Sequence, residues 1–195
     1  EEKVLQNLRN SPLIRSYSEV LEDKVLVQYD QQQFIAQIKG VEPASLLKIN
    51  HQNMLYAGSF DIFKDSIHYA LIGAQVQANL RVPIEGTNNT LQLFSPRKGT
   101  SGTSVNPLDE VNIRGLSPSG VLHYQQGFDN LIITPLGFAK DLLNEYDRVS
   151  AVEIYTKDST QVYTLQEETQ RALGERFIVK NREEQNPLLY KTIRS

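Results

Sequence analysis

Residues Ala70–Pro96, ALIGAQVQANLRVPIEGTNNTLQLFSP, decide the fold class of this chain. The apolar run that opens the segment ends at Gly73, and Val76 and Leu80 then lie four residues apart, as neighbours on one helix face do. A turn over residues 83–89 leads into a second apolar strand at Thr90–Phe94. Strand, short helix and strand in succession predict an α+β domain in which the helix packs on a sheet.

The residues before this segment predict a meander of strands behind a short helix. Residues 1–10 begin with acids and have apolar side chains on one face, the pattern of an amphipathic helix. We expect Glu22–Lys24 to turn the chain and residues 51–64, which show no clean period, to form a connecting region. Strands are predicted at Leu13–Leu21, Val25–Tyr29 and Phe34–Val41.

The residues after the segment predict further strands and two longer helices. We expect a strand at Glu110–Leu116, a turn at 117–120, and an apolar strand at Asn130–Thr134 that leads through Pro135 into a helix ending near Glu145. Strand Val149–Thr156, amphipathic helix Gln161–Leu173 and a returning strand Phe177–Val179 follow. This succession predicts a βαβ or split-βαβ unit, as in ferredoxin-like halves.

Composition narrows the class of function. The chain has 195 residues, 39% of them hydrophobic and 22% charged, as in globular proteins. A net charge of −3 provides no basic field for nucleic acid, so we expect no nucleic-acid partner. Without cysteine there is no disulfide, thiolate metal site or cysteine nucleophile. No apolar run reaches the roughly 18 residues that cross a bilayer, and because the chain opens on Glu1 we expect it to be a piece of a longer protein.

No motif in the sequence indicates a reaction, a metal or a cofactor. The three histidines, His51, His68 and His123, are far apart and lack partners at metal-ligand spacing. The run GTSGTS at 99–104 lacks the Gly-Lys-Ser/Thr ending of a phosphate loop and precedes Pro107. We therefore predict a protein that works by binding, with no catalytic residue, and keep a stand-alone enzyme as the remote alternative.

The segment Ser95–Asp109, SPRKGTSGTSVNPLD, is longer than a hairpin connection requires. Loops of this length are usually functional or disordered. It begins with two cations, Arg97 and Lys98, on an otherwise slightly acidic chain, which suits an acidic partner. Its apolar anchors are few: Val105 and Leu108, beside Pro107. A loop tip without function is the alternative.

Several phrases, taken in order, resemble one family of membrane transport proteins. They are Val25–Glu42 (VLVQYDQQQFIAQIKGVE), Ala70–Leu80 (ALIGAQVQANL), Thr90–Pro96 (TLQLFSP), Val111–Gly115, Gly120–Asp129, Ile132–Leu143, Val149–Asp158 and Arg176–Tyr190. In this order and spacing the chain resembles the extracytoplasmic, MacB-like periplasmic core domain of FtsX/MacB-type ABC-transporter permeases, in the lipoprotein-releasing LolC/LolE branch.

The resemblance implies where the domain lies and how it is divided. It implies an inner-membrane permease whose first and second membrane helices flank this fragment, with the fragment itself in the periplasm. It also implies two lobes. One is an α+β lobe built from both chain ends, 1–56 and 145–195, and includes the βαβ unit. The other is a mainly β lobe inserted at 57–144.

The resemblance further implies partners and a mechanism. A separate subunit would bind and hydrolyse ATP, and a second permease copy or a sister would complete the transporter. The domain would bind a lipoprotein substrate or a periplasmic lipoprotein carrier and transmit motion to it. The position that docks the carrier in the family matches the loop with Arg97, Lys98, Val105, Pro107 and Leu108. Peptide or small-molecule export and regulation of cell-wall hydrolases, functions of related branches, remain alternatives.

Overall fold

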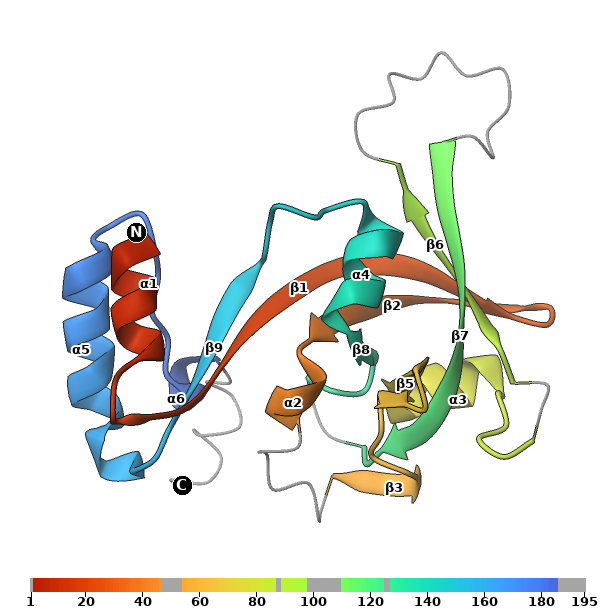
Figure 1. Cartoon of the computed structure of the whole chain (residues 1–195). Coiled ribbons are helices and arrows are strands. Elements are labelled where there is room, and N and C mark those ends of the chain that lie inside the picture. Colours follow the sequence, from red (N-terminus) through yellow and green to blue (C-terminus); the bar gives the residue numbers. More distant parts are fainter. Residues whose placement is uncertain (1, 47–53, 87–88, 98–109, 125–126, 186–195) are drawn as a thin grey trace. The chain divides into compact units, whose positions relative to one another are not determined.

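The computed structural model describes residues 2–46, 54–86, 89–97, 110–124 and 127–185 (Figure 1). The chain divides into two compact units, one of residues 1–17 with 153–195 and one of residues 18–152. Helices and strands are mixed throughout, which confirms the predicted α+β class. The bounds at residues 17 and 152 differ from the predicted lobe bounds at 56 and 145, because residues 18–46 belong to the sheet of the larger unit.

The larger unit is built on a closed ring of paired strands. Strand β7 pairs with both β6 and β5, so the order β7-β6-β1-β2-β8-β5 returns to β7. The pairs β2–β8 and β5–β7 are parallel and the others in the ring antiparallel. The strands are β1 (Ile14–Tyr29), β2 (Gln32–Val41), β5 (Ile67–Ile72), β6 (Leu91–Pro96), β7 (Val111–Leu122) and β8 (Leu131–Pro135). Two short strands, β3 (Leu55–Gly58) and β4 (Phe63–Lys64), extend it by pairing with β7 and β5.

Two helices cover the inner face of this ring. Helix α3 (Ala74–Leu80) buries Val76 and Leu80, and helix α4 (Leu136–Leu143) buries Phe138 and Leu142, all in one apolar cluster with residues of β1, β2 and β6. Both helices end at a residue in the left-handed conformation, Arg81 or Asn144. The helix over 74–80 and the helix that follows strand 130–134 are thereby confirmed. A short helix, α2 (Pro43–Leu46), follows β2.

Glycine allows α4 to lie against β2. A Cβ at Gly40 would overlap the Cβ of Ala139 and would lie 3.3 Å from the Cα of Leu136. The contact places the buried apolar face of α4 directly on the strand pair β2–β8. Gly40 therefore has a packing role within β2.

Several local predictions were wrong, for one shared reason. Glu22–Lys24 does not turn the chain: it pairs with Lys39, Ile38 and Gln37 inside the long strand β1. Residues 117–120 likewise belong to the continuous strand β7, which pairs there with β5 and β3. The predicted connection at 51–64 contains β3 and β4. Polar and glycine-containing segments remain extended where a neighbouring strand satisfies their backbone groups.

The smaller unit contains α1 (Glu2–Arg9), the beginning of β1, most of β9 (Ala151–Thr156), the 3₁₀ turn η2 (Ser159–Gln161), α5 (Val162–Leu173) and α6 (Arg182–Gln185). Strand β9 pairs with β1, and the guanidinium of Arg9 lies 4.4 Å from the centre of the Tyr17 ring. The predicted strand at Phe177–Val179 is not formed, so the βαβ unit is not confirmed. The glutamine side chains of α5 bind this segment instead, as described below.

Candidate interaction site at the base of the β6–β7 loop

The loop predicted to dock a partner connects β6 to β7. Antiparallel pairs run from Leu91 opposite Leu116 to Pro96 opposite Val111. Beyond the last pair, the backbone N–H of Arg97 donates to the carbonyl of Glu110 at 2.6 Å. The strand β6 thus includes Ser95 and Pro96, which were predicted as loop. The pairing brings the two ends of the loop together on a rigid hairpin.

Of the five predicted site residues, the structure describes one. Arg97 follows the last residue of β6 and is exposed. Its Nε donates a hydrogen bond to Oδ1 of Asn112 at 3.2 Å, so the side chain has a defined direction. The other four lie outside the described residues: Lys98, Val105, Pro107 and Leu108.

Asn112 connects the base of the loop to helix α4. Its side-chain oxygen accepts from Arg97, and its Nδ2 donates to the carbonyl of Leu142, in the last turn of α4, at 3.1 Å. A helix leaves its last carbonyls without intrahelical partners, so this amide satisfies one of them. Sequence reasoning missed this residue. The signal was an asparagine inside a strand, where that residue type is depleted.

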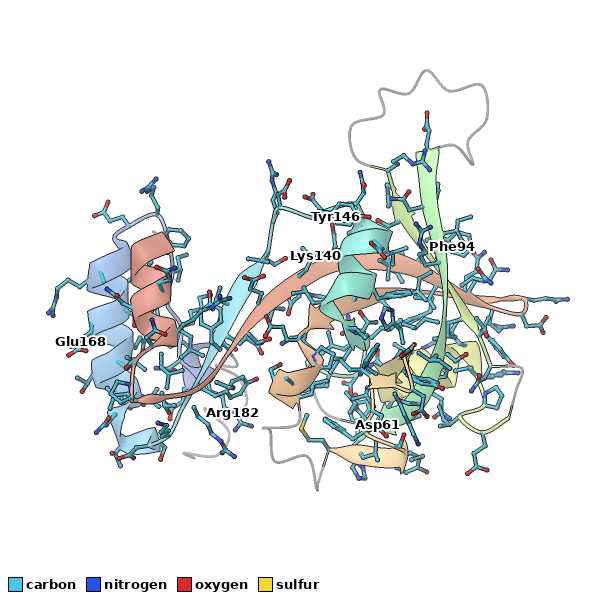
Figure 2. All side chains as sticks on the ribbon, in the orientation of Figure 1. Asp61, Phe94, Lys140, Tyr146, Glu168 and Arg182 are labelled. Atoms are coloured by element: carbon cyan, nitrogen blue, oxygen red, sulfur yellow. The ribbon has the colours of Figure 1, made fainter. Side chains whose placement is uncertain are left out.

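A second group of polar side chains lies beside this link. The hydroxyl of Tyr146, labelled in Figure 2, donates to Oδ1 of Asp141 at 3.0 Å. This bond and the charge of Asp141 raise the pKa of Tyr146 above its ordinary value of 10, and the positive charge of Arg114 opposes the shift. Arg114 lies two residues after Asn112 on β7, so both side chains extend from the same face of the sheet. The face beside the loop thus offers two guanidinium groups, an amide, a phenol and a carboxylate.

These groups suit binding. Hydrogen-bond donors and cations on a paired hairpin can hold a carboxylate-bearing or carbonyl-bearing partner. In the part of the chain that the structure describes, no cluster of three or more His, Asp or Glu side chains could hold a metal. Among the described residues, the pKa is shifted for Tyr146 in the larger unit and for Tyr155 and Asp158 in the smaller unit.

The smaller unit has a shallow groove of about 480 Å³ next to α5. Gln170 donates to the carbonyls of Gly174 and Phe177 and accepts from the N–H of Val179. Gln166, one turn earlier, donates to the carbonyl of Val179 at 2.9 Å. The two amides therefore satisfy the backbone of the segment that was predicted to pair as a strand. The groove itself is lined by Tyr163, Gln166, Glu167, Gln170, Arg171, Val179 and Glu184.

A search for membrane-spanning helices among the described residues finds none with the length and apolar character needed to cross a bilayer. The apolar residues near the end of the sequence lie outside the described residues: Leu188, Leu189, Tyr190 and Ile193.

Comparison with known proteins relates this fold to one class. No family model and no curated protein matches the sequence significantly. Among solved structures, the extracellular domain of the noncanonic ABC-type transporter YknZ from Gram-positive bacteria matches with a TM-score of 0.58 and 14% identity, over 92% of this chain and 88% of that one. The periplasmic region of MacB from Actinobacillus actinomycetemcomitans matches with a TM-score of 0.57 and 11% identity, over 89% and 72%.

At these identities the likeness establishes the fold. The chain has the fold of the extracytoplasmic domains of the ABC-type transporters YknZ and MacB. The MacB-like architecture that the sequence phrases predicted is thereby confirmed.

Proposed function

We propose that this chain is the periplasmic domain of an inner-membrane ABC-transporter permease of the lipoprotein-releasing branch. The supporting observation is that the fold likeness to two extracytoplasmic transporter domains extends over about nine tenths of the chain. In this proposal, membrane helices flank the fragment, a separate cytoplasmic subunit hydrolyses ATP, and a second permease copy or a sister completes the transporter.

The domain acts by binding and by transmitting motion. A closed ring of strands with two helices packed against it moves as a body, because its buried side chains interlock. Motion passed to any part of the ring would therefore shift the β6–β7 hairpin together with it.

The docking site for a periplasmic lipoprotein carrier is the β6–β7 loop with Arg97, Lys98, Val105, Pro107 and Leu108. The paired hairpin and the bond from Arg97 to Asn112 support this assignment, since they hold Arg97 at one end of the loop and Val111 near the other. The exposed guanidinium of Arg97 suits an acidic surface on the carrier.

The test is calorimetric titration of this domain with the periplasmic lipoprotein carrier of the same organism. A variant in which a short Gly-Ser turn replaces residues 98–108 should lose binding, whereas Arg97→Ala should weaken it and reduce its dependence on salt. Ile178→Ser is the matched control, because Ile178 is 80% exposed and lies in the smaller unit.

Binding that survives replacement of the loop would remove the loop as the docking site and leave the lipoprotein-releasing role standing. Failure of the intact domain to bind the carrier would contradict that role. The fold would then point to the sister permease or to a related export branch.

A further inference from the structure

Four apolar side chains form an exposed row across four neighbouring strands. Ile35 of β2 pairs with Leu26 of β1, Leu26 pairs with Phe94 of β6, and Phe94 pairs with Ile113 of β7. Directly paired residues extend from the same face of a sheet. Ile35 is 66% exposed, Leu26 and Ile113 are each 37% exposed, and Phe94, labelled in Figure 2, is partly exposed. We refer to these four residues as the apolar row.

The apolar row lies on the face of these strands that the core does not use. The alternate residues Val25, Val27 and Leu93 are buried in the cluster with α3 and α4. A sheet with one face in the core normally presents polar side chains on the other. Contiguous exposed apolar residues instead mark a surface that contacts a partner.

The residues beside the apolar row define the chemistry of that partner. One step along the strands, Gln33 pairs with Gln28 and Gln28 with Gln92, and the Gln33 amide donates to Oε1 of Gln28 at 3.3 Å. On the other side, Gln37 pairs with Lys24, the one charged residue among these pairs. The Gln37 amide donates to Oε2 of Glu22 at 3.2 Å, so one carboxylate lies close to the cation of Lys24 and a partner of one charge sign gains little here. A side-chain amide both donates and accepts, so a surface of this composition is complementary to itself.

We propose that the apolar row is the contact between two copies of this chain, which pack sheet face against sheet face about a two-fold axis. In such an arrangement the same patch serves both copies, with apolar side chains in the centre and the polar side chains of the two flanking rows around them. The proposal rests on strand register, exposure and charge, and is independent of the proposed transport function.

The size of the patch sets the strength of the contact. Four strands about 4.8 Å apart and three rows of side chains about 6.8 Å apart cover an area on the order of 400 Å² on each copy. A stable complex buries about 800 Å² on each partner. We therefore expect a weak, reversible dimer. Each copy carries a net charge of −3, so the dimer should be stronger at high salt, which screens the repulsion.

The absence of cysteine allows a direct test with single-cysteine variants of the full chain. Facing sheets lie about 10 Å apart, which is too far for a disulfide but within reach of a short bismaleimide. Ile35→Cys and Ile113→Cys are the probes at the two ends of the apolar row, and Ile178→Cys, 80% exposed in the smaller unit, is the control. An axis along the row predicts cross-linking of each probe with itself, and an axis along the strands predicts cross-linking only in their mixture.

Either cross-linking pattern supports the proposal if its rate is at least about tenfold above the cross-linking rate of Ile178→Cys. Equal rates for all three variants would overturn it. As a second measurement, sedimentation velocity of the unmodified chain should show self-association that increases with salt, and Ile35→Lys should abolish it. Lysine at this exposed position places a charge within the apolar contact, opposite either the same position or Ile113 of the second copy, without disturbing the core. A chain that stays monomeric at millimolar concentration and high salt would also refute the contact.

Discussion

Replacement of Gly40 by alanine should destabilise the larger unit, because the added methyl has no room. It would overlap the Cβ of Ala139 on α4, and the nearest backbone atom, the Cα of Leu136, lies 3.3 Å away. Gly40 is buried and paired on both sides, with Leu21 and with Thr134, so neither strand nor helix can yield freely. Overpacking of this kind costs about 1–3 kcal/mol.

The matched control is Gly137→Ala, in α4 between the two contact residues Leu136 and Ala139. A Cβ at Gly137 meets nothing within 4 Å, and the residue is exposed on α4. The same substitution should therefore stabilise the protein here, by about 0.4–1 kcal/mol, because it restricts the unfolded chain. The same substitution of glycine by alanine is therefore expected to lower the free energy of unfolding at Gly40 and to raise it at Gly137.

Urea unfolding followed by circular dichroism measures both effects. With a slope of about 2 kcal/mol per molar urea, a loss of about 2 kcal/mol lowers the midpoint by about 1 M. Combining Gly40→Ala with Ala139→Gly should recover part of the loss, since the overlapping methyl is gone, and the double-mutant cycle isolates that coupling. An equal cost of Gly40→Ala with and without the Ala139 methyl would refute the steric explanation.

Two further predictions concern polar contacts. Asn112→Ala removes the acceptor of the Arg97 side chain and the donor to the carbonyl of Leu142, and each lost bond should cost about 0.5–1.5 kcal/mol of stability. The backbone N–H of Arg97, which donates to Glu110 beside this link, should then exchange its hydrogen faster. An unchanged exchange rate would contradict the link. The pKa of Asp158 is lowered from 3.8 because its carboxylate accepts hydrogen bonds from the N–H and the hydroxyl of Thr160. The contribution of Asp158 to folding stability is therefore present above pH 3.8 and is lost as the pH falls through the lower pKa of the folded state. Exchange of the Thr160 amide should rise over that acid range, and Asp158→Asn, which keeps an acceptor oxygen, should remove this pH dependence; persistence of it in the variant would disprove the assignment.

Some elements could be predicted because their signals are local. Helices 74–80 and 136–143 follow from apolar spacing within one segment and from the Gly73 and Pro135 positions that begin them. The strands Val25–Tyr29 and Phe34–Val41 follow from alternation on both sides of a loop at residues 30–33, and the structure shortens that loop by pairing Tyr29 with Gln32. In each case the side chains that stabilise the element are close to it in sequence, so a periodic pattern is sufficient evidence.

Other elements depend on partners distant in sequence. Glu22–Lys24 has the composition of a turn but is extended because β2 pairs with it across the hairpin. Phe177–Val179 has the composition of a strand, but the amides of Gln166 and Gln170 take its backbone groups, so no strand pairs there among the described residues. Composition gives the preference of a segment, and its hydrogen-bond partners decide between the alternatives.

The candidate site also has features that the sequence predicted and features that only the tertiary structure showed. The sequence alone identified the cationic start of the loop at Arg97 and the length that made the loop notable. Only the tertiary structure showed that Asn112 joins Arg97 to α4, and that Ile35, Leu26, Phe94 and Ile113 form one row. The sequence by itself determined the α+β class and the positive charge at the start of the loop, because both depend on residue type and spacing along the chain. The closed ring, its register and the surfaces that the register creates required the structure, because they arise from contacts between strands that are far apart in sequence.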